Sequence, residues 1–359
     1  MNAASSALGP RRMLILVAIV LVSVATGVLH YAGGSDLAVF MLGVVALGGL
    51  AWVISFTTEE VGEHFGPAVT GVLQSTLGNL PELFVVLFAL SAGEVVVAQT
   101  SILGSLFANA LLVLGATLFV GARVAPDKRM RFSTRLPNDT ATLLLLAVFI
   151  IVVLGVSDQI GDRASRHQVA ISVVGAIVLL LVYGVWLASY LRSDGEGEPA
   201  LEEPRSAGMP MSVAVVLLAL GGLGAALVSE WFVASIDQTA RELGLSKAFI
   251  GLVIVAIAGN AVEHVVGVVL AAKGKSDLAV SVVKNSVAQI AAFLFPALVL
   301  MSLFFDDRLT FVASPVYIGA LALMAIAVWQ VTSDGEATEF EGIALIGLYA
   351  VLATLAFYE

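Results

Sequence analysis

Long apolar segments alternate with short polar breaks along most of this chain. A helix needs about 20 apolar residues to cross the hydrocarbon core of a bilayer, and segments of that length recur from one end to the other. They predict eleven transmembrane helices and hence an all-α polytopic membrane protein. The expected ranges are about 13–31, 36–56, 67–91, 97–121, 138–156, 168–191, 210–229, 246–272, 278–304, 314–331 and 341–357.

The longest polar interruption runs from Arg192 to Ala207 and contains five acidic residues. It leaves six expected helices before it and five after it, which is typical of a linker between two halves. The expected organisation is an N-terminal tail and first helix at 1–35, a first five-helix unit at 36–191, an acidic cytoplasmic linker at 192–207 and a second five-helix unit at 208–359.

The composition is that of a membrane protein and argues against several other classes of protein. Hydrophobic residues make up 59% and charged residues 12% of the chain, far from the balance of a soluble domain. The net charge of −10 gives no sign of nucleic-acid binding, and the absence of cysteine excludes disulfides and thiolate metal sites. The expected partners are the lipid bilayer and inorganic cations, and a homo-oligomer is compatible with the sequence.

The distribution of lysine and arginine predicts the orientation, because cytoplasmic loops are enriched in these residues. With a cytoplasmic N-terminus, eleven basic residues fall inside and five outside, so the C-terminus is expected outside. The inner residues are Arg11, Arg12, Arg123, Lys128, Arg129, Arg131, Arg135, Arg192, Arg205, Lys273 and Lys275, and the outer ones are Arg163, Arg166, Arg241, Lys247 and Arg308. Without a visible targeting extension, the expected location is a bacterial inner (plasma) membrane.

A short motif occurs twice, each time near the middle of an expected span. Gly78–Glu82 reads GNLPE and Gly259–Glu263 reads GNAVE. A carboxylate at this depth costs several kcal/mol unless it meets a partner or an ion, so each glutamate is a candidate functional residue. An offset of 181 positions superposes the two copies, and an odd number of spans would place the second unit upside down. The sequence therefore predicts inverted repeats around a mid-membrane site, a plan typical of secondary transporters.

The motif supplies oxygen atoms that suit a hard cation. Pro81 cannot donate to the carbonyl of Leu77, and Gly78 beside it tolerates an unwound backbone. Asn79 adds an amide oxygen and Glu82 a charge. In the second copy, Gly259, Asn260 and Glu263 have the same roles. Such ligands suit Ca²⁺, and two close carboxylates are neutralised either by two protons or by one divalent cation. This equivalence indicates a proton/divalent-cation antiporter with Glu82 and Glu263 as metal ligands.

Other polar residues of the expected spans have two interpretations. Gln99, Ser105, Asn109, Asn285, Ser286 and Gln289 could complete the cavity wall, or could form hydrogen bonds between helices. His264 and Lys284 are candidate modulators. At 100° per residue, Lys284 projects opposite Ser286 and so away from the ion, with its ammonium reaching toward the cytoplasmic surface. The alternative is an ammonium that competes with the cation for a carboxylate.

Two stretches, Thr57–Gly121 and Ser229–Ser302, closely resemble the calcium/proton exchangers of the cation/Ca²⁺ exchanger superfamily, whose signature is Gly-Asn-x-x-Glu, with His after the second copy. The resemblance implies eleven spans, an extra first helix, an acidic segment between halves, and an ion site at the two glutamates with both asparagines beside them. Two positions depart from the pattern: Lys284-Asn285 replaces apolar-Gly, and Pro81 is similar to the sodium/calcium branch of the superfamily.

The expected function is exchange of Ca²⁺, or a related divalent cation, for H⁺ by alternating access around the two glutamates. Such a secondary transporter needs no cofactor and is not an enzyme. A sodium-coupled cation exchanger is the main alternative. An intramembrane metalloenzyme using His64 and His264 is a remote one, because a spacing such as H-E-x-x-H is absent from the sequence.

Overall fold

A computed structural model describes residues 3–62, 64–65, 73, 76–192 and 208–359, most of them in helices. The first half contains α1 (Ala3–Tyr31), α2 (Asp36–Gly62), α4 (Leu80–Ser91), α5 (Val95–Phe107), η1 (Ala108–Val113), α6 (Leu114–Val124), β1 (Arg129–Arg131), α7 (Arg135–Ile160), η2 (Arg163–His167) and α8 (Gln168–Arg192). The second half begins with α9 (Met211–Leu243), α10 (Lys247–Phe249), η3 (Ile250–Val255), α11 (Ala256–Gly259) and α12 (Ala261–Ala272). It ends with α13 (Ser276–Gln289), η4 (Ile290–Leu294), α14 (Phe295–Met301), η5 (Ser302–Phe304), α15 (Pro315–Thr332), β2 (Glu336–Thr338) and α16 (Glu339–Tyr358).

The prediction of a polytopic helical membrane protein is confirmed. Within the described residues, nine helices are long and apolar enough to cross a membrane, and a tenth span is a pair bent by 61° between Gly259 and Ala261. The expected span at 67–91 is described mainly as the 12-residue helix α4; residues 66–72, 74 and 75 lie outside the described part. The number eleven therefore stays a prediction. The expected span at 210–229 is part of the longer α9, which has 33 residues.

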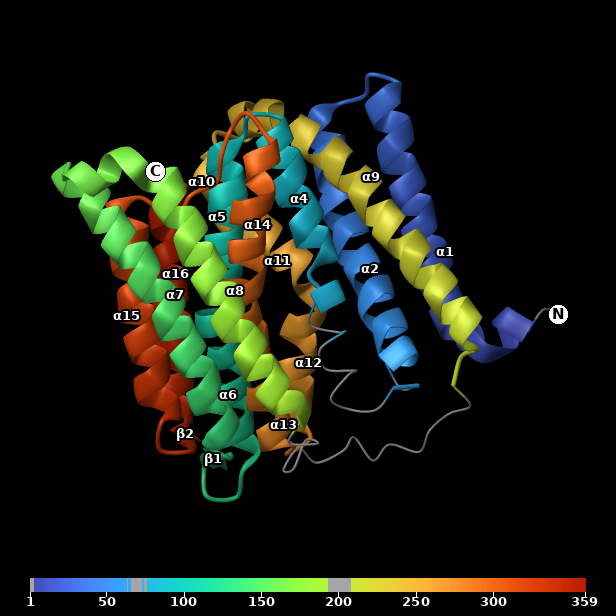
Figure 1. Ribbon diagram of the computed structural model, residues 1–359. Coiled ribbons are helices and arrows are strands. Elements are labelled where there is room, and N and C mark those ends of the chain that lie inside the picture. The colour runs from blue at the N-terminus through green and yellow to red at the C-terminus, as the bar shows by residue number, and fades with distance from the viewer. Residues whose placement is uncertain (1–2, 63, 66–72, 74–75, 193–207) are drawn as a thin grey trace.

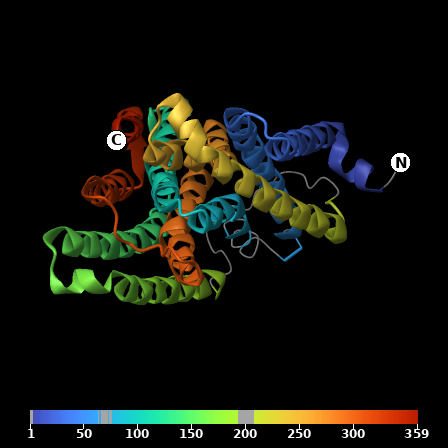
Figure 2. The same cartoon turned by 90° about the horizontal axis from the view of Figure 1, so that it is seen from above.

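The bundle has two ends (Figure 1). The hairpin end carries β1 and β2, together with the turn between α12 and α13. In the first turn of α13, Asp277 accepts a hydrogen bond of 2.5 Å from the backbone of Ser133. The far end carries the turns α4–α5 and α9–α10. Seen from above, α1, α2 and α9 lie on one side of the bundle and α7 and α8 on the other (Figure 2).

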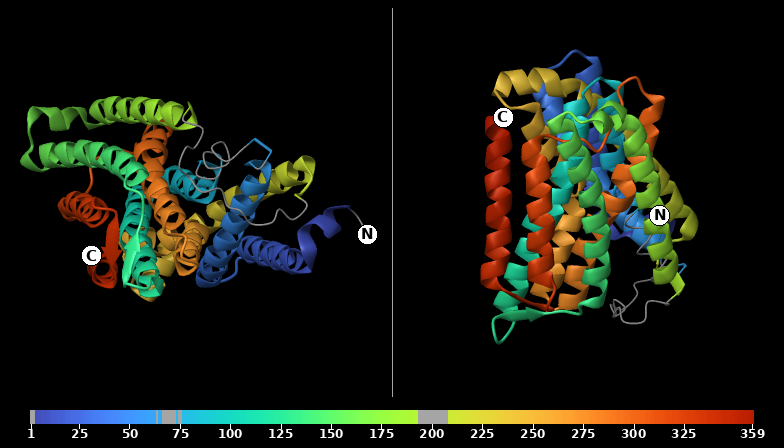
Figure 3. Two further views of the ribbon diagram at one scale, coloured as in Figure 1. Left: turned by 90° about the horizontal axis from the view of Figure 1, so that it is seen from below. Right: turned by 60° about the vertical axis from the view of Figure 1, so that its left-hand side comes forward.

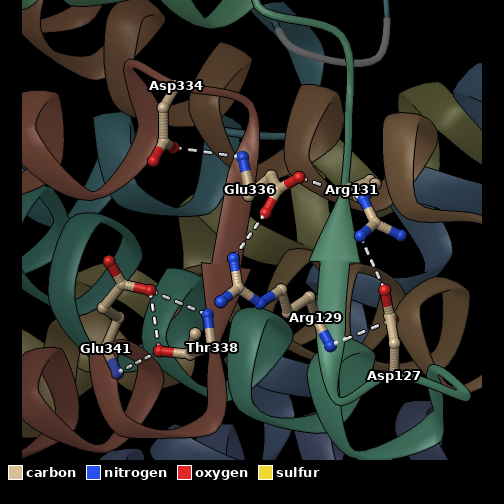
Figure 4. Close-up of polar contacts among 7 residues, drawn as sticks. All are labelled: Asp127, Arg129, Arg131, Asp334, Glu336, Thr338 and Glu341. Carbon is tan, nitrogen blue, oxygen red and sulfur yellow. Dashed lines mark hydrogen bonds and ion pairs between the residues drawn. The ribbon is translucent and has the colours of Figure 1, made fainter.

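The two short strands close the hairpin end beneath α15 and α16 (Figure 3). They pair antiparallel, with Arg131 opposite Glu336. The Glu336 carboxylate accepts hydrogen bonds of 3.0 Å from both Arg129 and Arg131 (Figure 4). Thr338 begins α16 with a capping box to Glu341, which satisfies the free backbone donors of the first turn. The segment before α7 is thereby tied to the helix that ends the chain.

Glycines let several helices approach backbone to backbone. A Cβ on Gly115 of α6 would lie 2.7 Å from the carbonyl oxygen of Gly342 in α16. A Cβ on Gly251 of η3 would lie 3.0 Å from the backbone nitrogen of Ser101 in α5, and one on Gly104 would overlap the backbone of Leu252. Small residues at such contacts are typical of membrane helices, where close packing replaces the hydrophobic effect between helices.

Candidate ion site at two helix breaks

Both copies of the motif interrupt a helix. Asn79 lies at φ −85°, ψ 8° just before α4, and Asn260 lies at φ −110°, ψ 17° between α11 and α12. Pro81 is in the first turn of α4, where a missing N–H leaves no intrahelical bond unmade. This position agrees with the expectation that the carbonyl of Leu77 receives no bond from Pro81. The second copy breaks without a proline, at Asn260 directly after Gly259.

Each break places a glutamate in the first turn of the following helix, Glu82 in α4 and Glu263 in α12. The N-terminal end of a helix carries partial positive charge, so it stabilises a carboxylate and any state in which that carboxylate is ionised. In Figure 1, α4 runs from the middle of the bundle to the far end, whereas α12 runs from the middle to the hairpin end. Two oppositely directed helix N-termini therefore meet near the middle of the bundle.

The two motifs contact each other. A Cβ on Gly259 would lie 3.6 Å from the Cβ of Glu82, so the second break packs directly on the first glutamate. Asn260 Nδ2 donates a hydrogen bond of 2.9 Å to Ser105 Oγ on α5, and Ser105, Asn260 and Glu263 all lie close to the Glu82 carboxylate. Ser286 Oγ on α13 donates to Glu263. Each glutamate thus has a serine at the equivalent position of its own half.

Burial distinguishes the two glutamates. Glu82 is 1% exposed, and within the described residues neither of its carboxylate oxygens accepts a hydrogen bond of ordinary geometry. Glu263 is partly exposed. It lines a small cavity with Ser55 of α2 and residues of both breaks; the lining residues are Ala51, Ser55, Gly78, Gly259, Asn260, Val262 and Glu263. Buried acceptors without donors are uncommon in proteins, and a carboxylate in this state fits a proton or a cation.

Four of the six expected cavity-wall residues, Ser105, Ser286, Asn109 and Asn285, lie near the motifs or on the helices that contact them. Ser105 and Ser286 contact the motif residues directly. Asn109 is fully buried, and its Nδ2 donates 3.0 Å to the Ser105 carbonyl. Asn285 is half-buried with an Oδ1 that has no hydrogen-bond partner in the described chain.

The other two residues contact different parts of the fold. Gln99 donates through Nε2 to the carbonyl of Val312, in the loop before α15 at the far end. It therefore joins α5 to a loop, and it is not among the residues that line the motif cavity. Gln289 is 4% exposed and interacts with Tyr183 of α8.

Lys284 points away from both glutamates. Its Nζ donates a hydrogen bond of 2.9 Å to Thr332 Oγ1, and the residue is only 2% exposed. The expectation that its ammonium reaches the cytoplasmic surface is therefore wrong. Thr332 is the last residue of α15, and a helix C-terminus carries partial negative charge that stabilises a cation. The sequence could not show this contact, because tertiary packing alone places the C-terminus of α15 beside Lys284.

His264 follows Glu263 on α12. Its Nε2 is buried and has no hydrogen-bond partner among the described residues. In the part of the chain that the structure describes, no three His, Cys, Asp or Glu side chains gather in a metal-binding group. The ring of His64 instead bonds to the carbonyl of Glu60 in its own helix turn. Nothing here places His64 and His264 in one site.

The described part of the chain contains three π-helical segments that were not expected from the sequence. Two of them, Ala108–Val113 and Ile290–Leu294, lie at equivalent positions of the two halves, and the third is Ile250–Val255. Such segments often occur at functional sites, because the extra residue per turn re-aims the side chains around it. Asn109 lies inside the first segment, and Gln289 directly precedes the second. The pattern of apolar residues could not predict these segments, because nearly every position in these spans is apolar.

Comparison with known proteins agrees with this geometry. A family model described as "Sodium/calcium exchanger protein" matches residues 35–191 and 213–358. The chain is 31% identical over 338 residues to the Ca²⁺/H⁺ antiporter ChaA of Bacillus subtilis (strain 168), covering 92% of this chain and 94% of that protein. It is also similar to the solved structure of native YfkE, with a TM-score of 0.80, 29% identity and coverage of 97% and 99%. The sodium-calcium exchanger NCX_Mj shares the fold at a TM-score of 0.55 and 21% identity.

These matches cover both halves of the chain and nearly the full length of the relatives, and they confirm the expected resemblance to cation exchangers. They place the chain among secondary transporters rather than enzymes. The protein belongs to the sodium/calcium exchanger protein family.

Proposed function

We propose that this protein exchanges Ca²⁺ for H⁺ across a membrane, with Glu82 and Glu263 as the shared binding groups. The observation that carries the proposal is the buried Glu82 carboxylate, which has no hydrogen bond of ordinary geometry within the described chain and lies against Gly259 and Asn260 of the other motif. Its charge needs a neutralising partner, and Glu263 repels it. Relatives named Ca²⁺/H⁺ antiporters support calcium as the ion.

The chemistry follows from charge. Two carboxylates in a poorly solvated site are stable together when both are protonated or when one divalent cation lies between them. Ca²⁺ prefers six to eight oxygen ligands, and the breaks supply carboxylate, amide and backbone oxygens. Ser105 and Ser286 add hydroxyl groups that can turn toward a carboxylate or an ion. Binding of the cation therefore displaces the two protons, and binding of the protons displaces the cation.

The proposed architecture is a pair of inverted repeats, 36–191 and 208–359, preceded by an extra helix within 1–35. The family model supports it by matching twice. Backbone geometry adds support: Gly93 and Gly274, 181 positions apart, have φ angles of 76° and 73°. The linker expected at 192–207 lies outside the described residues except for Arg192.

The proposed orientation has the hairpin end in the cytoplasm and the C-terminus outside, in a plasma membrane. Support comes from Arg129 and Arg131 on β1 and from Lys273 and Lys275 at the α12–α13 turn, all at the hairpin end. Bacterial relatives support the choice of membrane.

Reconstituted vesicles test the function. An imposed pH gradient should drive Ca²⁺ uptake by the wild-type protein without Na⁺, and Glu82→Gln or Glu263→Gln should abolish it, because one remaining carboxylate cannot balance a divalent charge. Intact folding of each variant is checked by size-exclusion chromatography. Near-normal proton-driven uptake by either variant would falsify the site. Uptake that requires Na⁺ would identify the sodium-coupled alternative instead.

A further inference from the structure

At the far end, Lys247 joins segments from different halves of the chain. Its Nζ lies 2.8 Å from Glu94 Oε1 and 2.8 Å from Asp237 Oδ1. Glu94 occupies the turn between α4 and α5, Lys247 is the first residue of α10, and Asp237 lies on α9. The side chains of Lys247 and Glu94 are 36% and 18% exposed, so this pair is partly shielded from water.

Below this ion pair, α5 and η3 form a close contact that we call the far-end seam, made by Ser101 and Gly104 of α5 and by Gly251 and Leu252 of η3. At Gly251 and Gly104 the two backbones are so near that any added side chain would meet main-chain atoms. Ser105, which acts on Glu82, follows Gly104 directly. The seam therefore lies between the far end and the more buried glutamate.

The cavity at the motifs lies on the opposite side of the breaks. It is lined by Val262 and Glu263 of α12, which runs toward the hairpin end, and by Ser55 in the last third of α2. Glu263 is partly exposed, whereas Glu82 is 1% exposed. Among the residues that the structure describes, the site is thus closed toward the far end and more accessible from the hairpin end.

The sequence does not repeat this ion pair at the equivalent positions of the other half. The residues 181 positions away from Lys247, Glu94 and Asp237 are Gly66, Lys275 and Phe56. A glycine and an apolar ring cannot pair with a lysine, whatever their placement. This ion pair therefore acts at the far end, and its repeat equivalents cannot form the same pair at the hairpin end.

The other polar contacts at this end of α10 are within the second half. Ser246 caps α10 by accepting from the Phe249 backbone at 2.9 Å, and it donates 2.6 Å to the carbonyl of Ala356 in α16. Asp237 is also in the second half and pairs with Arg241 at 2.5 Å. Of these polar contacts, the one between Lys247 and Glu94 links α10 to the first half and must separate if α5 moves away from η3.

We propose that the Lys247–Glu94 ion pair is a latch that holds the far-end seam closed and shifts the protein toward the state accessible from the hairpin end. The proposal rests on the proposed function only in requiring that the site become accessible from each end in turn. A contact present in one of two states lowers the free energy of that state alone, so its removal raises the population of the other.

Cysteine accessibility tests the latch directly, because the natural chain has no cysteine that would need removal. Ser101→Cys places a single thiol in the seam, and Ser55→Cys places one in the cavity. In right-side-out vesicles, Glu94→Gln should raise the rate at which a membrane-impermeant maleimide labels position 101 by up to about fivefold, the range expected for a partly exposed ion pair. In inverted vesicles, labelling of position 55 should fall only by the fraction of molecules that leaves the state accessible from the hairpin end.

Glu94→Gln is the sharpest variant, because Lys247 keeps its bond to Asp237 and Glu94 makes no side-chain cap on α5. Lys247→Gln should have the same effect or a larger one. The matched control is Arg241→Gln, which breaks a neighbouring ion pair at the same end but leaves Lys247 bonded to both partners. Labelling by this control should equal that of the parent.

Equal labelling of position 101 in the parent, Glu94→Gln and Lys247→Gln proteins overturns the latch, as does an equal increase in the Arg241→Gln control. The readout does not use transport. A labelling shift in a protein that fails to exchange Ca²⁺ for H⁺ would support the latch and reject the proposed function, and normal exchange without a shift would do the reverse.

Discussion

Gly259 lies against Glu82, so the second helix break is a neighbour of the first carboxylate: a methyl group on Gly259 would be 3.6 Å from the Cβ of Glu82. This separation is ordinary van der Waals contact. The glycine is therefore not required by sterics in the state seen here, and its backbone φ is not in the left-handed region. We infer that the glycine instead provides backbone flexibility at the break between the two glutamates.

Gly259→Ala should therefore fold with nearly unchanged stability yet transport more slowly, by about tenfold if the break must change shape by an amount that costs about 1.4 kcal/mol more. Gly251→Ala is the matched comparison, because its Cβ would press on the backbone of α5 at 3.0 Å. That variant should lose thermal stability. Thermal unfolding in detergent and initial Ca²⁺ uptake rates measure the two effects. A Gly259→Ala protein with full activity would show that the break is rigid during transport.

Exchange should be electroneutral, with two protons for one Ca²⁺. Either two protons or one Ca²⁺ neutralises the two negative charges of the carboxylates, so both carry the same charge across the membrane. One pH unit is worth about 1.4 kcal/mol per proton, so two protons should sustain a roughly hundredfold Ca²⁺ gradient per unit. A transported net charge would add about 2.3 kcal/mol per 100 mV. Vesicles at a fixed pH gradient, clamped with valinomycin and K⁺ at 0 mV and about −100 mV, should reach the same Ca²⁺ distribution. A voltage-dependent distribution would exclude this stoichiometry.

Lys284 and Thr332 should respond unequally to substitution. Lys284→Met removes a buried ammonium and leaves Thr332 still donating to the Val328 carbonyl at 2.8 Å, so stability should change little. Thr332→Val leaves the ammonium buried without that acceptor and should destabilise the protein by about 1–3 kcal/mol. The double variant should recover most of this loss. Thermal unfolding of all four proteins closes the cycle, and a large loss in Lys284→Met alone would contradict the argument.

Ca²⁺ uptake by Lys284→Met should remain at the wild-type level, because the side chain faces α15 and not the motifs. Complete loss of uptake in a well-folded Lys284→Met protein would indicate that the ammonium acts on a glutamate after all. Thr332→Val, which keeps the charge, separates that electrostatic effect from a packing effect.

The strand pair should loosen in acid. Hydrogen bonds from Arg129, then Arg131, hold the pKa of Glu336 below its usual value of 4.5. A depressed pKa in the folded state means that the stabilisation is present above pH 4.5 and is lost as the pH falls through the lower folded value. In hydrogen–deuterium exchange, the protection factors of the Met130 and Ala337 backbone amides should therefore stay constant down to about pH 5 and decline below it. Glu336→Gln should remove this dependence, and an unchanged profile would reject the assignment.

Much of the architecture was predictable because membrane depth limits what a sequence can contain. In hydrocarbon, backbone groups must bond within a helix and each span must be apolar for about 20 residues, so most spans appear directly in the sequence. The same constraint makes Glu82 and Glu263 conspicuous, and the offset of 181 identifies equivalent positions such as Ser105 and Ser286. Those two serines do reach the motif residues, as the repeat suggested.

Tertiary structure alone decided which polar side chains meet. Gln99 and Ser105 share a helix, yet one donates to a loop carbonyl and the other receives Asn260, because different helices pack on α5 at these depths. Lys284 stays buried because the C-terminus of α15 arrives beside it. Apolar sequence fixes how long each span is, since that depends on water and lipid. The rotation and contacts of a helix depend on its neighbours, and only packing among helices determines those.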